Sequence, residues 1–226
     1  MDIVDFHSHI LPHADHGSSS TATSLTQLKL AQDFGVKRII LTPHYYPQKE
    51  NPDHFIERRE KCYAHLLKSL PSDAPELRVG AEILICDNIE EMPLLDQLCI
   101  RGTKVLLLEL PFSDFSKSYV DSVSYLTYNG YTVVLAHADR YNPSDIDALI
   151  DAGAKVQINA EALAKLFIGK HIKKWLDNGV VYAIGSDIHG EDKKAYKVFN
   201  NAIKKISCYI DNVSNMSDSI WNKTEK

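Results

Sequence analysis

The chain has 226 residues, a length that suits one large domain or two small ones. Apolar residues make up 44% of it and charged residues 24%, which is an ordinary globular balance with enough material for a core. Its net charge of −5 argues against a protein that tracks nucleic acid, because phosphate backbones require clustered Lys and Arg.

Short apolar runs, typical of buried strands, alternate along the chain with amphipathic stretches typical of helices. We predict strands over residues 3–6, 36–41, 77–81, 105–110, 132–136, 155–158 and 180–184. Helices are predicted over residues 25–34, 53–70, 119–129, 145–152 and 192–206, with further helical material before Gly179. Strands that alternate with helices imply parallel pairing through right-handed crossovers, and therefore an α/β protein.

Such a parallel arrangement either closes into a β/α barrel or stays open as a doubly wound sheet. In a barrel, catalytic groups are expected where the strands end. The chain has no internal repeat and no low-complexity linker, so we predict one domain over residues 1–210. Residues 211–226 are rich in Ser, Asn and Lys, and we expect them to form a flexible tail.

The four cysteines, Cys62, Cys86, Cys99 and Cys208, have no C-x-x-C spacing. No apolar run follows Met1 as in a secretory signal, and no stretch approaches the roughly 20 apolar residues that cross a bilayer. We therefore expect a cytoplasmic protein with free thiols and no direct membrane insertion. A cysteine phosphatase is not indicated, because no cysteine begins a C-x5-R loop.

Imidazole or carboxylate side chains stand at the ends of six predicted strands. They are His7, His9, His44, Glu82, Glu109, His137, Asp187 and His189. A single His or Glu in such a place is usually a hydrogen-bonding or solvated surface residue. Together, however, they would bring several charges into apolar surroundings, and burial of unpaired charges is costly unless a cation joins them. The joint pattern indicates a divalent metal centre at the carboxyl ends of the strands.

The residue types and their spacing also suggest which ions would bind. Side chains at positions i and i+2 of an extended segment point to one side, so His7 and His9 can hold one ion together. Mixed nitrogen and oxygen ligands favour Mn²⁺, Fe or Zn²⁺ over Mg²⁺ or Ca²⁺. Because the candidates exceed what one ion can hold, we expect two or three ions, with Mn²⁺ as the first choice.

The ordered motifs resemble those of the polymerase-and-histidinol-phosphatase (PHP) superfamily. More narrowly, the chain is similar to the bacterial CpsB-type protein-tyrosine phosphatases that regulate capsule and exopolysaccharide synthesis. The matching motifs are HSHILPHADHG at 7–17, TPH at 42–44, GAEI at 80–83, HADRY at 137–141 and SDIH at 186–189. H-x-H alone is shared with amidohydrolases, but the ordered set is specific and runs from residue 1 to about 195.

The resemblance implies a distorted barrel of seven β/α units with a three-metal centre. It assigns the eight residues named above as metal ligands, and it assigns Arg140 to steer the phosphate. The family usually has Asp-Asp-Gly after H-x-H, with the second Asp a ligand. Here His16 takes that place, with Asp15 as the alternative ligand. Lys194 stands where the family has an arginine, which keeps the charge but loses the bidentate fork that fits phosphate.

Clustered divalent ions suit phosphomonoester hydrolysis, because they activate water and clamp phosphate oxygens. The first hypothesis is a metal-dependent protein-tyrosine phosphatase whose partner is a phosphotyrosine protein, with the tail of a polysaccharide-synthesis tyrosine kinase as a candidate. The second is a small-molecule phosphatase, for histidinol phosphate or a nucleotide, with a deaminase-like hydrolase more distant. The third is a regulatory module without turnover, which Lys194 supports.

Overall fold

The computed structural model describes residues 4–112 and 115–221. The strands are β1 (Val4–Ser8), β2 (Arg38–Leu41), β3 (His44–Tyr45), β4 (Glu76–Val79), β5 (Glu82–Leu84), β6 (Val105–Glu109), β7 (Thr132–Leu135), β8 (Lys155–Asn159) and β9 (Val181–Gly185). The α-helices are α1 (Thr21–Asp33), α2 (Pro52–Leu67), α3 (Leu95–Leu98), α4 (Ser118–Tyr128), α5 (Pro143–Asp151), α6 (Ala160–Ala164), α7 (Lys170–Asp177), α8 (Ala195–Lys205) and α9 (Ile210–Trp221). Two 3-10 turns are η1 (Ile89–Glu91) and η2 (Ala138–Arg140).

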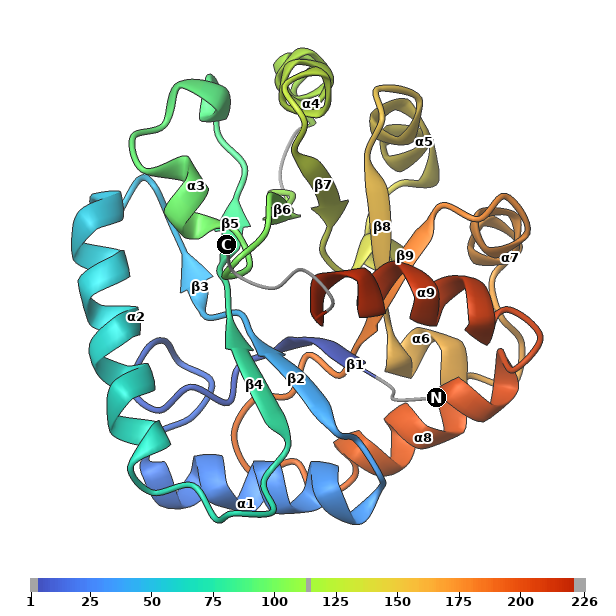
Figure 1. Cartoon of the computed structure of the whole chain (residues 1–226). Helices are drawn as coiled ribbons and strands as arrows, with labels where there is room; N and C mark the ends of the chain where they lie inside the picture. The colour runs from blue at the N-terminus through green and yellow to red at the C-terminus, as the bar shows by residue number, and fades with distance from the viewer. Residues whose placement is uncertain (1–3, 113–114, 222–226) are drawn as a thin grey trace.

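The strands pair in parallel throughout the part of the chain that is described, as the alternation of strands and helices predicted. One sheet has the order β1-β2-β4 and the other the order β3-β5-β6-β7-β8-β9. Only two residues separate β2 from β3 and β4 from β5, so these pairs continue from one sheet into the other. Figure 1 shows the strands gathered in the middle with the helices around them.

Strands β1 and β9 are the two ends of this arrangement, and they lie in contact. The backbone hydrogen bonds described between these two parts of the chain lie at the carboxyl ends of β1 and β9. Asp187 N–H donates to the carbonyl of His7 (2.8 Å), and His9 N–H donates to the carbonyl of Ile188 (3.1 Å). The fold is therefore a distorted β/α barrel whose last seam is joined at the strand ends, which confirms the predicted fold class. The seam brings the segments after β1 and after β9 together.

Alternate residues of the strands face two apolar clusters. On β6, Leu106 and Leu108 join the larger cluster, which includes side chains of α1, α2, α4, α5, α7 and α8. Val105 and Leu107 join a smaller cluster with residues of β1, β2, β7 and β9. Strands buried on both faces are typical of parallel sheets covered by helices, and they read as continuous apolar runs in the sequence.

Residues 210–221, most of the segment predicted as a tail, form helix α9, and residues 222–226 lie outside the described part of the chain. The helix contacts β1 and β9, and its Ile220 is 1% exposed within the smaller apolar cluster. The ring of Trp221 lies under the guanidinium groups of Arg38 (5.5 Å) and Arg78 (5.1 Å). The apolar positions that hold this helix are few, so a reading of composition overlooked them. No helix among the described residues is long and apolar enough to cross a membrane.

Replacement of Ile220 by Ala is expected to destabilise the whole domain by about 2–4 kcal/mol, because it removes buried apolar volume from the smaller cluster. Urea unfolding followed by circular dichroism measures the change. The exposed Asn212 of the same helix is the control, and Asn212→Ala should stay within about 0.5 kcal/mol of wild type. Equal stabilities for the two variants would contradict the packing of α9 onto the strands.

Candidate metal centre

The candidate ligands come together at the carboxyl ends of the strands. His7 lies on β1 and His9 directly after it, His44 begins β3, Glu82 begins β5 and Glu109 ends β6. His137 follows β7, and Asp187 and His189 follow β9. Seven of these eight side chains are less than 10% exposed, and the exception is His189 at 33%. The structure therefore brings the predicted strand-end residues together in one place.

The carboxylate of Glu82 lies at the centre of the cluster. Its Oε2 atom is 2.8 Å from Nδ1 of His44 and 3.2 Å from Nε2 of both His7 and His9. Its other oxygen, Oε1, is 2.8 Å from Nε2 of His137. A fully buried carboxylate is thus surrounded by four imidazole rings.

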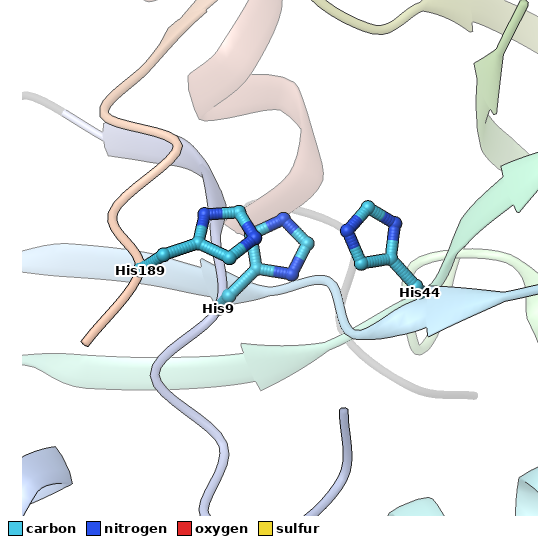
Figure 2. A group of neighbouring side chains, drawn as sticks. All are labelled: His9, His44 and His189. Carbon is cyan, nitrogen blue, oxygen red and sulfur yellow. The ribbon is translucent and has the colours of Figure 1, made fainter. Parts of the chain in front are cut away.

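Figure 2 shows three histidines of the cluster, with their rings turned toward one another. His9, His44 and His189 reach it from the segment after β1, from β3 and from the segment after β9. The ring centroid of His9 is 3.9 Å from that of His189 and 4.4 Å from that of His44. Their nitrogens lie close enough together to hold one metal ion, as do the groups His7–His9–Glu82 and His44–Glu82–Glu109.

Asp15 and His16 have different surroundings. The carboxylate of Asp15 accepts hydrogen bonds from Nδ1–H of His9 (2.7 Å) and from the backbone amides of Gly17 (2.8 Å) and His44 (3.0 Å). A carboxylate that holds the far nitrogen of a ligating histidine is typical of metal sites. The exposed ring of His16 lies 4.8 Å from that of His44 and 4.9 Å from that of His189. Asp15 thus orients His9, and His16 stays a predicted ligand whose ring lies beside those of two other candidate ligands.

Two of the candidate ligands have backbone conformations that side chains rarely adopt. The φ angles are +31° at His137 and +52° at Asp187, both in the left-handed region. Each of these residues lies two positions after the end of a buried strand, which is β7 for His137 and β9 for Asp187. Strain of this kind persists only where surrounding contacts enforce it, and it concentrates at functional sites.

The arrangement of electron pairs fits divalent metal ions. Because a carboxylate can only accept, Nδ1 of His9 donates to Asp15, and Nε2 of His9 is turned toward Nε2 of His7 at 3.0 Å. Glu82 Oε2 and His44 Nδ1 are both buried without a hydrogen bond, although they lie 2.8 Å apart. Buried polar atoms need a partner, and a cation bound between these atoms would supply one. The residues present therefore suit a metal centre.

The pKa values show the same demand for positive charge. Burial alone would lower the pKa of His9, but Asp15, Asp187 and Glu82 outweigh it and hold this pKa well above its usual range. Burial likewise opposes the protonation of His137, yet Glu109 and Glu82 raise its pKa to about 9. Carboxylates thus stabilise positive charge at the rings, and a divalent cation supplies such charge in the same place.

Arg140 and Lys194 lie on one side of the cluster. Both line a hollow of about 410 Å³ that also includes Asp187 and His189. Nη2 of Arg140 donates to Oδ2 of Asp187 at 2.5 Å, and the side chain of Arg140 is 40% exposed. Lys194 is exposed at the start of α8. Two cationic side chains therefore border the open space next to the candidate ligands.

Several residues that shape the centre are not among the site residues predicted from the sequence. Gln157 and Asn159 on β8 are buried amides that bond to candidate ligands. A Cβ on Gly17 would lie 2.2 Å from Cβ of His9, and a Cβ on Gly185 would lie 2.5 Å from Cβ of His7. Only glycine permits such close approaches. In the sequence, Gly17 belongs to the first motif. For Gln157 and Asn159, the alternation of side chains along β8 is the feature that could have predicted that both face the centre.

A parallel β/α fold with imidazoles and carboxylates gathered where its strands end defines the class of metal-dependent hydrolases. Within that class, residues 3–216 match the family described as Capsular polysaccharide synthesis, CpsB/CapC. The chain belongs to this family, which confirms the resemblance that its motifs predicted.

The chain is similar to tyrosine-protein phosphatases of several bacteria. Tyrosine-protein phosphatase YwqE of Bacillus subtilis is 31% identical over 201 residues, which cover 83% of this chain and 77% of the relative. Tyrosine-protein phosphatase CpsB of Streptococcus agalactiae is 27% identical, with 87% and 89% covered. A crystal structure from work on YwqE of B. subtilis and CpsB of Streptococcus pneumoniae, described as metal-dependent tyrosine phosphatases, matches the fold with a TM-score of 0.80. It is 24% identical and covers 99% of this chain and 96% of its own.

We expect Glu82→Gln to lower the metal content of the purified protein from two or three ions to below one, because the central negative charge is lost. Elemental analysis of protein prepared without chelators measures it. Glu76→Gln is the matched control. The side chain of Glu76 is 65% exposed, and Glu76 begins β4, at the end opposite to the ligands. Unchanged metal content in Glu82→Gln would contradict the central role of this carboxylate.

Proposed function

We propose that the chain is a metal-dependent protein-tyrosine phosphatase of capsular or exopolysaccharide synthesis. The observation that carries this proposal is the buried Glu82 carboxylate among four imidazoles, with Arg140 and the hollow beside it. The relatives that bear the name tyrosine-protein phosphatase support the same reaction. Its partner would be a phosphotyrosine protein, with the tail of a polysaccharide-synthesis tyrosine kinase as a candidate.

Two or three divalent ions would complete the centre, with Mn²⁺ as our first choice and Fe or Zn²⁺ as alternatives. The residues that would hold them are His7, His9, His16, His44, Glu82, Glu109, His137, Asp187 and His189. Bound divalent ions supply activation of water at neutral pH and charge neutralisation at phosphate oxygens.

The two cationic side chains at the hollow would bind the phosphoryl group. Asp187 holds one nitrogen of Arg140, which fixes the guanidinium beside the ligands and leaves its other N–H groups for phosphate oxygens. Arg140 would therefore stabilise the charge that gathers on the phosphoryl oxygens in the transition state. The ammonium of Lys194 borders the same hollow and would add a more flexible contact.

An aromatic groove beside Arg140 favours an aryl phosphate over a small polar one. The groove has a volume of about 200 Å³ and is lined by Leu110, Pro111, Phe112, Phe115, Arg140, Tyr141, Asn142 and Asp145. The ring of Phe112 is 77% exposed and lies 5.7 Å from the ring of Tyr141. An exposed ring next to the phosphate-binding arginine can stack on the phenyl ring of phosphotyrosine.

We also propose that the protein acts in the cytoplasm. Its four cysteines, Cys62, Cys86, Cys99 and Cys208, are all free, which is typical of a reducing compartment. Burial raises the pKa of the Cys99 thiol to about 12, so this cysteine is a poor nucleophile. The chemistry is therefore assigned to the cluster at the strand ends.

Replacement of Arg140 by Ala tests the phosphatase most directly. We expect kcat/KM on a phosphotyrosine peptide with saturating Mn²⁺ to fall by about 10²–10³, as for other deleted transition-state donors. Lys194→Ala should cost less and act mainly on KM, whereas Lys194→Arg should raise kcat/KM by restoring a planar fork. Equal rates for wild type and Arg140→Ala would remove Arg140 from the site.

Phe112→Ala is expected to lower kcat/KM for the phosphotyrosine peptide about tenfold, the equivalent of one lost aromatic contact of ~1.4 kcal/mol. Hydrolysis of glycerol phosphate, which has no ring, should hardly change. Phe167→Ala is the control, because Phe167 is 82% exposed but lies between α6 and α7. An equal loss on both substrates would show that the groove does not select aryl groups.

A further inference from the structure

Strand β8 brings amides to the centre. The candidate ligands other than His16 lie on or shortly after other strands, whereas β8 contributes Gln157 and Asn159. These residues are 0% and 4% exposed, and as positions i and i+2 of one strand they point to the same side. Buried amides are retained where their hydrogen bonds are satisfied, so their partners indicate what they do.

The amide of Gln157 fixes the orientation of His7. Its Oε1 atom lies 2.6 Å from the backbone nitrogen of His137, and a backbone N–H can only donate. The atom that faces it must therefore be the amide oxygen. The same oxygen lies 3.0 Å from Nδ1 of His7, so Nδ1 carries the hydrogen and Nε2 offers its electron pair to the centre.

The other end of this amide continues to a second candidate ligand. Nε2 of Gln157 donates to Oδ1 of Asn159 (2.9 Å), and Nδ2 of Asn159 donates to Oδ2 of Asp187 (3.0 Å). The backbone N–H of Asn159 in turn donates to Asp139 (2.9 Å), two residues after His137. In each of these hydrogen bonds a donor faces an acceptor, so the bonds run in one consistent direction.

Close packing leaves the amide of Gln157 no alternative place. Gly185 lies against it, and a Cβ at that position would be 2.7 Å from Nε2 of Gln157 as well as 2.5 Å from Cβ of His7. The ring of His7 and the amide are therefore held together by backbone that cannot move aside cheaply.

We propose that Gln157 and Asn159 are positioning residues that set the tautomer of His7 and the orientations of His137 and Asp187 for metal binding. The effect on metal affinity rests on the proposed function, but the tautomer of His7 does not. Loss of a hydrogen-bond partner of a ligand typically lowers metal affinity about 10–100-fold. We expect that loss for Gln157→Leu, and a smaller one for Gln157→Glu, which keeps an acceptor for His7 and for the amide of His137.

The test measures Mn²⁺ binding to metal-free protein by electron paramagnetic resonance of the free ion. Val156→Ala is the control, because Val156 lies on the same strand with 0% exposure but packs in the larger apolar cluster. It should leave the Mn²⁺ dissociation constant within about twofold of wild type, since it touches no ligand. Asn159→Leu removes the link to Asp187 and the acceptor of the Gln157 amide, but it keeps the bonds of Gln157 Oε1 to His7 and His137. It decides the matter if circular dichroism shows that Gln157→Leu is unfolded.

A second readout needs no metal. Nitrogen-15 NMR spectra of histidine-labelled protein report the tautomer, and the signals of His7 are those that disappear in His7→Ala. We expect hydrogen on Nδ1 of His7 in wild type and a mixture of tautomers in Gln157→Leu. The proposal would be overturned if wild type and Gln157→Leu had the same tautomer populations at His7. It would also be overturned if a folded Gln157→Leu bound Mn²⁺ as tightly as Val156→Ala does. A wild type that keeps the tautomer but binds no Mn²⁺ would contradict the proposed function and leave the role of Gln157 in orienting His7 standing.

Discussion

The carboxylate of Glu82 is buried among four imidazole rings, and the arrangement of the ends of the barrel follows from this contact. Burial of a carboxylate costs several kcal/mol unless opposite charge lies against it. The same need for opposite charge raises the pKa values of His9 and His137. Divalent cations supply that charge, because the electron pairs already converge on one region. The site is thus most stable when the ions that catalysis needs are bound.

The fold provides the contacts that keep these groups in place. The hydrogen bonds between the segments after β1 and β9 set Asp187 beside His7, and this pairing is accompanied by a left-handed backbone at Asp187. Gly17 and Gly185 allow the backbone to approach His9 and His7 more closely than any side chain would permit. A rigid arrangement of this kind reduces the reorganisation that metal binding and phosphate binding require.

Much of the fold and of the centre could be predicted from the sequence, because both depend on short-range patterns. Apolar runs marked the strands, and the imidazoles and carboxylates just after them marked the candidate ligands from His7 to His189. The breaks between β2 and β3 and between β4 and β5 escaped prediction, since short strands leave little periodic signal. So did helix α9, whose stability comes from tertiary contacts of Ile220 and Trp221. The amides of β8 escaped prediction too, because their role depends on partners on other strands, of which His7 is 150 positions away along the chain.

The central claim is that the cluster around Glu82 binds divalent metal ions. Anomalous diffraction at the manganese edge, from crystals grown with Mn²⁺, locates such ions directly. We expect two or three peaks, with at least one within about 2.5 Å of Glu82 Oε2 and in contact with Nε2 of His7 or His9. Crystals that contain Mn²⁺ but show no peak near Glu82 would contradict the account.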